Sequence, residues 1–176
     1  MPTISTDRLL ELLARYVAES GTAVDLLLVG ALALQAYGYT DRATLDVDGE
    51  VTGPLDPLVQ FLAAHQIPAD LTHNFSGWSI VAMPPDYRAR ASLLVEQPGL
   101  RVRVLSPVDF IIAKLRRGTD LDCDDAAFVV RRFGVAPAAI QAAAEAALAA
   151  SPQDTALFLF RKTVDLFCRT LGTDHR

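Results

Sequence analysis

Two aspartates in the segment TLDVDGEV are separated by a single residue, and this spacing carries the clearest chemistry in the sequence. The alternation predicts a strand with Leu45 and Val47 on one face and Asp46 and Asp48 on the other. Two carboxylates on one face can share a hard cation such as Mg²⁺, whose shell is completed by water and phosphate oxygens. The pattern therefore indicates metal-assisted phosphoryl or nucleotidyl transfer. By itself the two-residue pattern favours a solvated edge strand, where outward charges discourage aggregation.

The acidic strand needs neighbouring elements to position it. VDLLLV (24–29) predicts a buried strand, Gly30 a turn whose N–H groups can meet a phosphate, and residues 31–37 a short helix. The sequence predicts further helices at 6–20, 56–66, 107–117, 122–133, 136–150 and 152–171, and further strands at 78–82, 92–95 and 100–105. We therefore expect one α/β (α+β) domain over residues 1–176, with a mixed sheet core to about residue 118 and C-terminal helices from about 119.

Composition narrows the class of protein. Hydrophobic residues make up 51% of the chain and charged residues 21%, which is typical of a globular protein. The net charge of −5 argues against a general nucleic-acid-binding surface. No apolar run reaches membrane-spanning length and the first residues do not resemble a secretory signal, so we expect no membrane partner and a cytoplasmic location. Cys123 and Cys168 fit no metal or redox spacing.

Two longer blocks extend the acidic motif into a family resemblance. VGALALQAYGYTDRATLDVDGE resembles the opening of the nucleotidyltransferase superfamily, and more narrowly its AbiEii-type toxin branch and related nucleotidyltransferase-like families of unknown function. RVRVLSPVDFIIAKLRRGTDLDCDDAAFVV resembles the strand, lysine-bearing helix and acidic helix that follow in that branch. The resemblance covers roughly residues 25–132. It implies a nucleotidyltransferase-type mixed sheet flanked by helices, Mg²⁺ or Mn²⁺ as cofactor, and a nucleoside triphosphate as donor.

The resemblance also assigns roles to six positions. It implies catalytic roles for Asp46, Asp48 and Lys114, metal ligation by Asp46 and Asp48, and nucleotide binding by Gly30, Arg42, Thr44 and Lys114. From the residues alone, Arg42 also fits a surface loop and Lys114 a solvated helix face.

The sequence departs from the family pattern in two places. Ala31 stands where the family has a second glycine or a serine, and the predicted strand WSIVAM lacks the family's third carboxylate. Asp86, Glu96 and Asp122 are the nearest acidic substitutes. The missing acid would remove a ligand and the base for an attacking hydroxyl, so whether the chain is an enzyme stays open.

Three hypotheses follow. The first is an Mg²⁺-dependent nucleotidyltransferase that modifies an RNA or protein hydroxyl, as a toxin–antitoxin component with a cognate antitoxin. The second is a catalytically degenerate domain of this fold that binds a nucleotide or a partner protein without turnover. The third is an interaction protein unrelated to nucleotides, whose apolar last helix, with Phe158, Phe160, Phe167 and Leu171, forms core or a homodimer contact.

Overall fold

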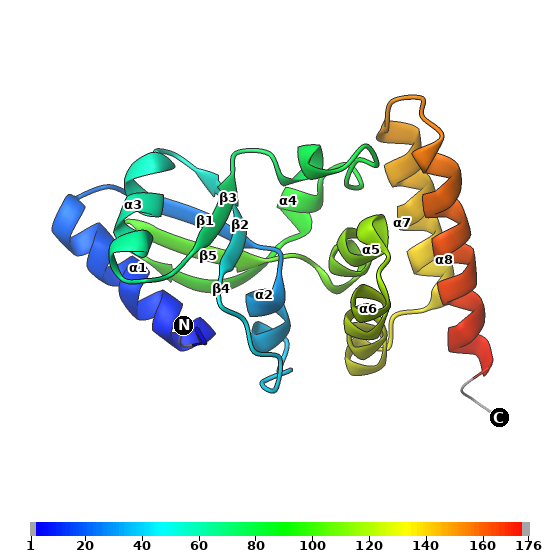
Figure 1. Cartoon of the computed structure of the whole chain (residues 1–176), viewed down its shortest axis with the longest axis horizontal. Coiled ribbons are helices and arrows are strands. Elements are labelled where there is room, and N and C mark those ends of the chain that lie inside the picture. Colours follow the sequence, from blue (N-terminus) through cyan, green and yellow to red (C-terminus); the bar gives the residue numbers. More distant parts are fainter. Residues whose placement is uncertain (1–2, 174–176) are drawn as a thin grey trace. The chain divides into compact units, whose positions relative to one another are not determined.

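The computed structural model describes residues 3–173, which form two compact units (Figure 1). The first unit comprises the described residues up to Phe75 together with Ala91–Leu105. The second comprises Ser76–Arg90 and the described residues from Ser106 onward. This division differs from the expected boundary near residue 118, because helix α5 (Pro107–Arg117) packs against the C-terminal helices and groups with them.

The first unit is built on a five-stranded mixed sheet in the order β3-β2-β1-β5-β4. Its strands are β1 (Val24–Leu28), β2 (Val47–Thr52), β3 (Ala69–Thr72), β4 (Ser92–Gln97) and β5 (Leu100–Val104). The central strand β1 pairs antiparallel with β2 and parallel with β5, β2 pairs parallel with β3, and β4 pairs antiparallel with β5. The expected mixed sheet flanked by helices is confirmed, and the predicted strands at 92–95 and 100–105 correspond to β4 and β5.

One predicted strand is wrong and one observed strand was not predicted. Residues 78–82 form no strand; the 3-10 helix η1 (Phe75–Trp78) leads into an irregular segment. Serine hydroxyls satisfy the backbone there in place of a neighbouring strand: Ser79 Oγ accepts from the Val81 nitrogen, and Ser76 Oγ from the Met83 nitrogen. The edge position beside β2 is occupied by β3 instead.

Three helices belong to the first unit: α1 (Thr6–Ser20), α2 (Ala31–Ala36) and α3 (Asp56–Ala64). Helix α1 begins after Ser5, whose hydroxyl accepts a hydrogen bond from the Arg8 nitrogen, and ends at Gly21 in the left-handed conformation. Its buried face packs against α2, α3 and β5 (Figure 1). The predicted helix at 6–20 is confirmed.

The second unit is helical. It contains α4 (Tyr87–Arg90), α5, α6 (Asp120–Phe133), α7 (Pro137–Ala150) and α8 (Ala156–Thr173). Helix α5 packs with α6, α7 and α8, and α7 packs with α8. On α8, Phe160 and Phe167 are buried, whereas Phe158 is 63% exposed. Within the described residues, none of the helices has the length and hydropathy needed to cross a membrane.

Candidate active site

The centre of the candidate site is Asp48, which packs against the turn after β1. Asp48 lies on β2 and is half-buried. Its carbonyl oxygen accepts a hydrogen bond from the Val29 nitrogen at 3.2 Å, and Gly30 follows directly as the first residue of the turn into α2. A Cβ atom on Gly30 would stand 2.1 Å from Asp48 Oδ2 and 2.8 Å from Asp48 Cβ. Only glycine therefore allows this turn to approach the carboxylate.

Asp46 stands just before the first residue of β2 and is exposed. It keeps the two-residue spacing from Asp48, although the strand itself begins at Val47, so Leu45 is 48% exposed rather than part of a buried face. Thr44 Oγ1 donates a hydrogen bond to Asp46 Oδ1 at 2.7 Å. Thr44 thus contacts the carboxylate directly. Its predicted contact with a nucleotide stays a prediction.

A third carboxylate, which the sequence analysis missed, lies beside Asp48. Asp70 on β3 is the register partner of Asp48, and partners on neighbouring parallel strands point to the same face about 4.8 Å apart. Asp70 is exposed. The alternation in ADLT was a usable signal, but four residues are too few to predict a strand without its pairing partner. Of the acids proposed instead, Glu96 pairs with Arg101 and Asp122 with Arg117.

Glu50 holds β3 in this position. It lies two residues after Asp48 on β2 and is 7% exposed. Its Oε2 accepts a hydrogen bond from the Phe75 nitrogen at 2.8 Å, just beyond the end of β3. A buried carboxylate is costly unless it is hydrogen-bonded, so this contact ties the segment after β3 to β2. Glu50 therefore has a structural part in placing Asp70.

Asp46 and Asp48 could provide part of the ligand set of a cation, with water and phosphate oxygens as the remaining ligands. No three His, Cys, Asp or Glu side chains in residues 3–173 converge closely enough to hold a metal ion by themselves. Mg²⁺ is commonly held by one or two carboxylates, with water and substrate phosphates completing its shell. Asp46 and Asp48, beside a turn that carries no side chain at Gly30, match that kind of donor set.

Arg42 lies in the loop between α2 and β2, before Asp46 in the chain, and is half-buried. Its carbonyl oxygen accepts a hydrogen bond from Gln35 Nε2 at 2.9 Å. The loop therefore has a defined attachment to α2. The predicted contact between the Arg42 guanidinium and a phosphate stays a prediction.

Lys114 belongs to the second unit, where its ammonium is buried between two carboxylates. Its Nζ lies 2.8 Å from Asp125 Oδ2 and 3.6 Å from Asp122 Oδ1, and its side chain is 8% exposed. Burial by itself would raise the pKa of Asp122, but hydrogen bonds from Arg117 and Thr119 outweigh it and hold that pKa at about 2. These contacts join α5 to α6. Contact of Lys114 with a triphosphate stays a prediction.

A mixed sheet that carries an acidic pair beside a bare glycine turn defines a nucleotidyltransferase-like domain. The family model described as nucleotidyltransferase of unknown function (DUF6036) matches residues 7–129, and the chain belongs to that family. A crystal structure of an antigenic nucleotidyltransferase-like protein from Paracoccidioides brasiliensis is similar over 99% of this chain and 91% of that chain, with a TM-score of 0.47 and 15% identity. No curated protein matches the chain.

The family match bears on the resemblance drawn from the sequence. It confirms the nucleotidyltransferase superfamily and the relation to families of unknown function. The narrower likeness to AbiEii-type toxins is not confirmed.

Proposed function

We propose that the chain is an Mg²⁺-dependent nucleotidyltransferase that transfers a nucleotide from a nucleoside triphosphate to an RNA or protein hydroxyl. The observation that carries the proposal is the contact between Asp48 and Gly30, with Asp46 before it on the chain and Asp70 beside it on β3. Membership of a nucleotidyltransferase family supports the same class of reaction.

Each residue of the site has a defined task in this proposal. Asp46 and Asp48 hold the cation, and Thr44 orients Asp46 through its hydroxyl. When bound, the ion neutralises the phosphate oxygens and orients them for in-line displacement. Arg42, in the loop before β2, is the proposed cationic contact of the triphosphate.

In this proposal Asp70 supplies the base that the predicted strand WSIVAM lacked. In this proposal its carboxylate takes the proton of the acceptor hydroxyl, whose oxygen then attacks the α-phosphorus. The bond between the α-phosphorus and the bridging oxygen breaks, and pyrophosphate leaves. Asp70 is exposed at the edge strand, so an acceptor can reach it from solvent.

Joint binding of the cation and the nucleotide tests the proposal. A ligand at a hundredfold excess over its dissociation constant stabilises the folded state by about 2.7 kcal/mol, and each kcal/mol raises the melting temperature by roughly 2–4 °C at this size. We expect Mg²⁺ with a nucleoside triphosphate to raise the melting temperature by several degrees, more than either does alone. Asp48→Asn should abolish most of that joint shift, whereas Asp165→Asn, an exposed acid on α8, should keep it. No joint shift with any of the four triphosphates would contradict the proposal.

One observation favours a second candidate function, a degenerate domain that binds a nucleotide without turnover. No three carboxylates converge on one point among the described residues. Pyrophosphate release separates the two functions. The enzyme releases pyrophosphate when RNA or protein acceptors are added, and Asp70→Asn removes this release while keeping the joint melting shift. The degenerate domain shows the shift and releases none.

The proposal extends to the cellular setting. A cytoplasmic nucleotidyltransferase that modifies an RNA or protein acceptor suits a toxin, with a cognate antitoxin as its partner. Expression of the chain in a bacterial host should then arrest growth, and Asp46→Asn should relieve the arrest. Equal growth with both forms would remove the toxin role and leave the nucleotidyltransferase proposal standing.

A homodimer through α8, where Phe158 is exposed, is a further proposal, and sedimentation of the full chain tests it.

A further inference from the structure

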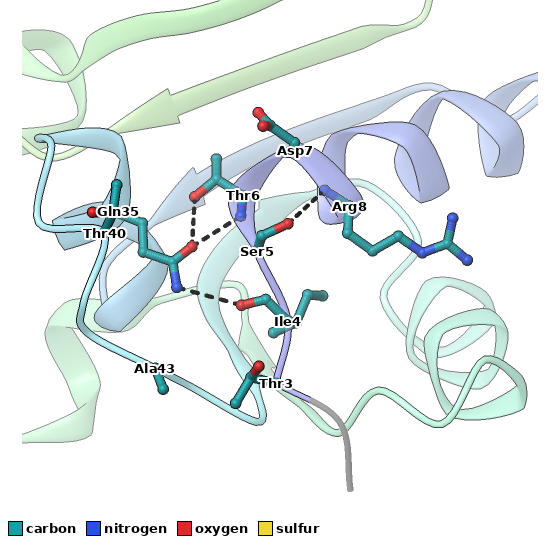
Figure 2. Close-up of a pocket in the computed structure, with 9 residues that line it drawn as sticks. All are labelled: Thr3, Ile4, Ser5, Thr6, Asp7, Arg8, Gln35, Thr40 and Ala43. Carbon is teal, nitrogen blue, oxygen red and sulfur yellow. Dashed lines mark hydrogen bonds between the residues drawn. The ribbon is translucent and has the colours of Figure 1, made fainter.

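Gln35 on α2 holds together three segments of the first unit. Its Oε1 accepts hydrogen bonds from the Thr6 backbone nitrogen at 3.0 Å and from Thr6 Oγ1 at 3.3 Å. Its Nε2 donates to the carbonyl oxygens of Ile4 at 3.3 Å and Arg42 at 2.9 Å. Figure 2 shows the amide between Ile4 and Thr6. A primary amide has two donors, and both are used here. The single proton of the Thr6 hydroxyl is shared between Gln35 Oε1 and the Leu32 carbonyl oxygen, which lies 3.2 Å from Thr6 Oγ1.

These partners accept the amide in one orientation only. The Thr6 nitrogen can only donate, and the carbonyl oxygens of Ile4 and Arg42 can only accept. A carboxylate in place of the amide would set an oxygen against both carbonyls and lose two donors. The position therefore distinguishes glutamine from glutamate, although the two side chains have nearly the same shape.

The contacts of Gln35 continue to Asp46 in two steps. The Ile4 nitrogen donates to the Thr44 carbonyl oxygen at 2.9 Å, so the segment before α1 pairs with the segment before β2. Thr44 Oγ1 then donates to Asp46 Oδ1 at 2.7 Å. Gln35, Ile4 and Thr44 thus form a continuous series of hydrogen bonds that ends on the carboxylate.

The loop between α2 and β2 is attached to other segments by hydrogen bonds. Between α2 and β2 the chain forms turns and the single bridge of Thr44 to Ile4, with no strand or helix of its own. A cavity of about 360 Å³ opens beside it, lined in part by Thr3, Thr40 and Ala43 (Figure 2). Side chains that border a cavity have fewer neighbours to fix them, so the hydrogen bonds of Gln35 contribute to where the loop lies.

We propose that Gln35 is a positioning residue that sets the separation of the Asp46 and Asp48 carboxylates. The inference rests on the proposed function, in which those carboxylates hold the cation. Residues that hydrogen-bond metal ligands directly typically change metal affinity 10–100-fold when substituted, and Gln35 reaches Asp46 through Ile4 and Thr44. Loss of the Gln35 amide should therefore weaken cation binding without removing either ligand.

A titration of the full chain with Mn²⁺ alone tests the inference, with electron paramagnetic resonance as the measure of bound ion. Gln35→Glu and the neutral Gln35→Met, which keeps the volume, should each bind Mn²⁺ at least about tenfold more weakly than the parent. The Glu variant is the sharper case, because an added negative charge near the site would by itself strengthen cation binding. Gln60→Glu, an exposed glutamine on α3, is the matched control and should not weaken binding. Unchanged or tighter binding by both Gln35 variants would overturn the inference.

A second measurement separates this inference from the proposed function. If the parent binds no Mn²⁺, the proposed function fails, and the backbone amide signals of residues 44–48 in ¹H–¹⁵N spectra decide the positioning role. Both Gln35 variants should shift those signals and speed their hydrogen exchange, whereas Gln60→Glu should not. Unchanged signals in the Gln35 variants would overturn the positioning role as well. If Gln35→Glu does not fold, Gln35→Met carries the same comparisons.

Discussion

Two pairs of aspartates, one on α6 and one at the start of β2, differ in their surroundings. Asp122 and Asp125 on α6 are buried, at 0% and 1% exposure, and lie against Lys114. Asp46 is exposed beside a threonine hydroxyl, and Asp48 packs against a bare glycine turn. A buried acid needs a permanent partner cation, because removing a charge from water is costly unless it is paired. A carboxylate at the surface stays hydrated until it binds a cation from solvent. The buried pair therefore suits a structural role, and Asp46 with Asp48 suits a functional one.

The largest expected effect on the free energy of unfolding comes from disrupting the buried pair, Asp122 and Asp125. Lys114→Met leaves two buried carboxylates without their ammonium and should lower the free energy of unfolding by about 3–5 kcal/mol. Urea denaturation measures this loss, and Lys162→Met, on the exposed face of α8, is the control with little expected change. A loss below about 1 kcal/mol would show that Lys114 is not structurally required.

The pH dependence of stability should reveal the same pair. Asp122→Asn should cost about 1.5–3 kcal/mol at neutral pH, the usual value of hydrogen bonds to a charged group. Because the folded pKa of Asp122 is about 2 and its ordinary value is 3.8, the unfolded chain binds more protons between those values. The stabilisation is complete above the ordinary value and is lost as pH falls toward 2. Denaturation series should show parent and variant converging in that window, and a constant difference down to pH 2 would contradict the assignment.

The contact between Gly30 and Asp48 predicts a smaller effect with a functional readout. Gly30→Ala forces a Cβ atom into the Asp48 side chain and should cost about 1–3 kcal/mol, the usual range for overpacking. It should also remove the joint melting shift with Mg²⁺ and a triphosphate. Gly172→Ala is the matched control, since a Cβ there meets nothing within 4 Å. Retention of the ligand shift in Gly30→Ala would separate Gly30 from the site.

The smallest effect on stability is expected at the surface pair. Asp46→Asn should change the free energy of unfolding by no more than about 0.5 kcal/mol, as is usual for an exposed position, and neighbouring like charges favour a slight gain. The same substitution should abolish most of the Mn²⁺ binding. A large loss of stability, measured by urea denaturation without metal, would assign Asp46 to the structural class of the buried pair.

The sequence by itself determined the features that depend on local signals. Helix α1 ends before Gly21, and α5 begins at Pro107 after its capping residue Ser106 and ends before Gly118. These ends could be predicted because caps are formed by residues within a few positions of the helix. The apolar run at 24–29 predicted the central strand, and the spacing of Asp46 and Asp48 predicted the candidate site. Both patterns lie within a few neighbouring residues.

Only the tertiary structure decided the features that depend on distant partners. Strand β3 exists because it pairs with β2, and that pairing alone places Asp70 beside Asp48. Lys114 looks the same in sequence on a solvated or a buried face, and α6 decides between them by presenting Asp122 and Asp125. Gln35 is an ordinary polar residue until Ile4, Thr6 and Arg42 surround its amide. Sheet pairing, burial and side-chain networks join residues far apart in the chain, so no local pattern of residue types records them.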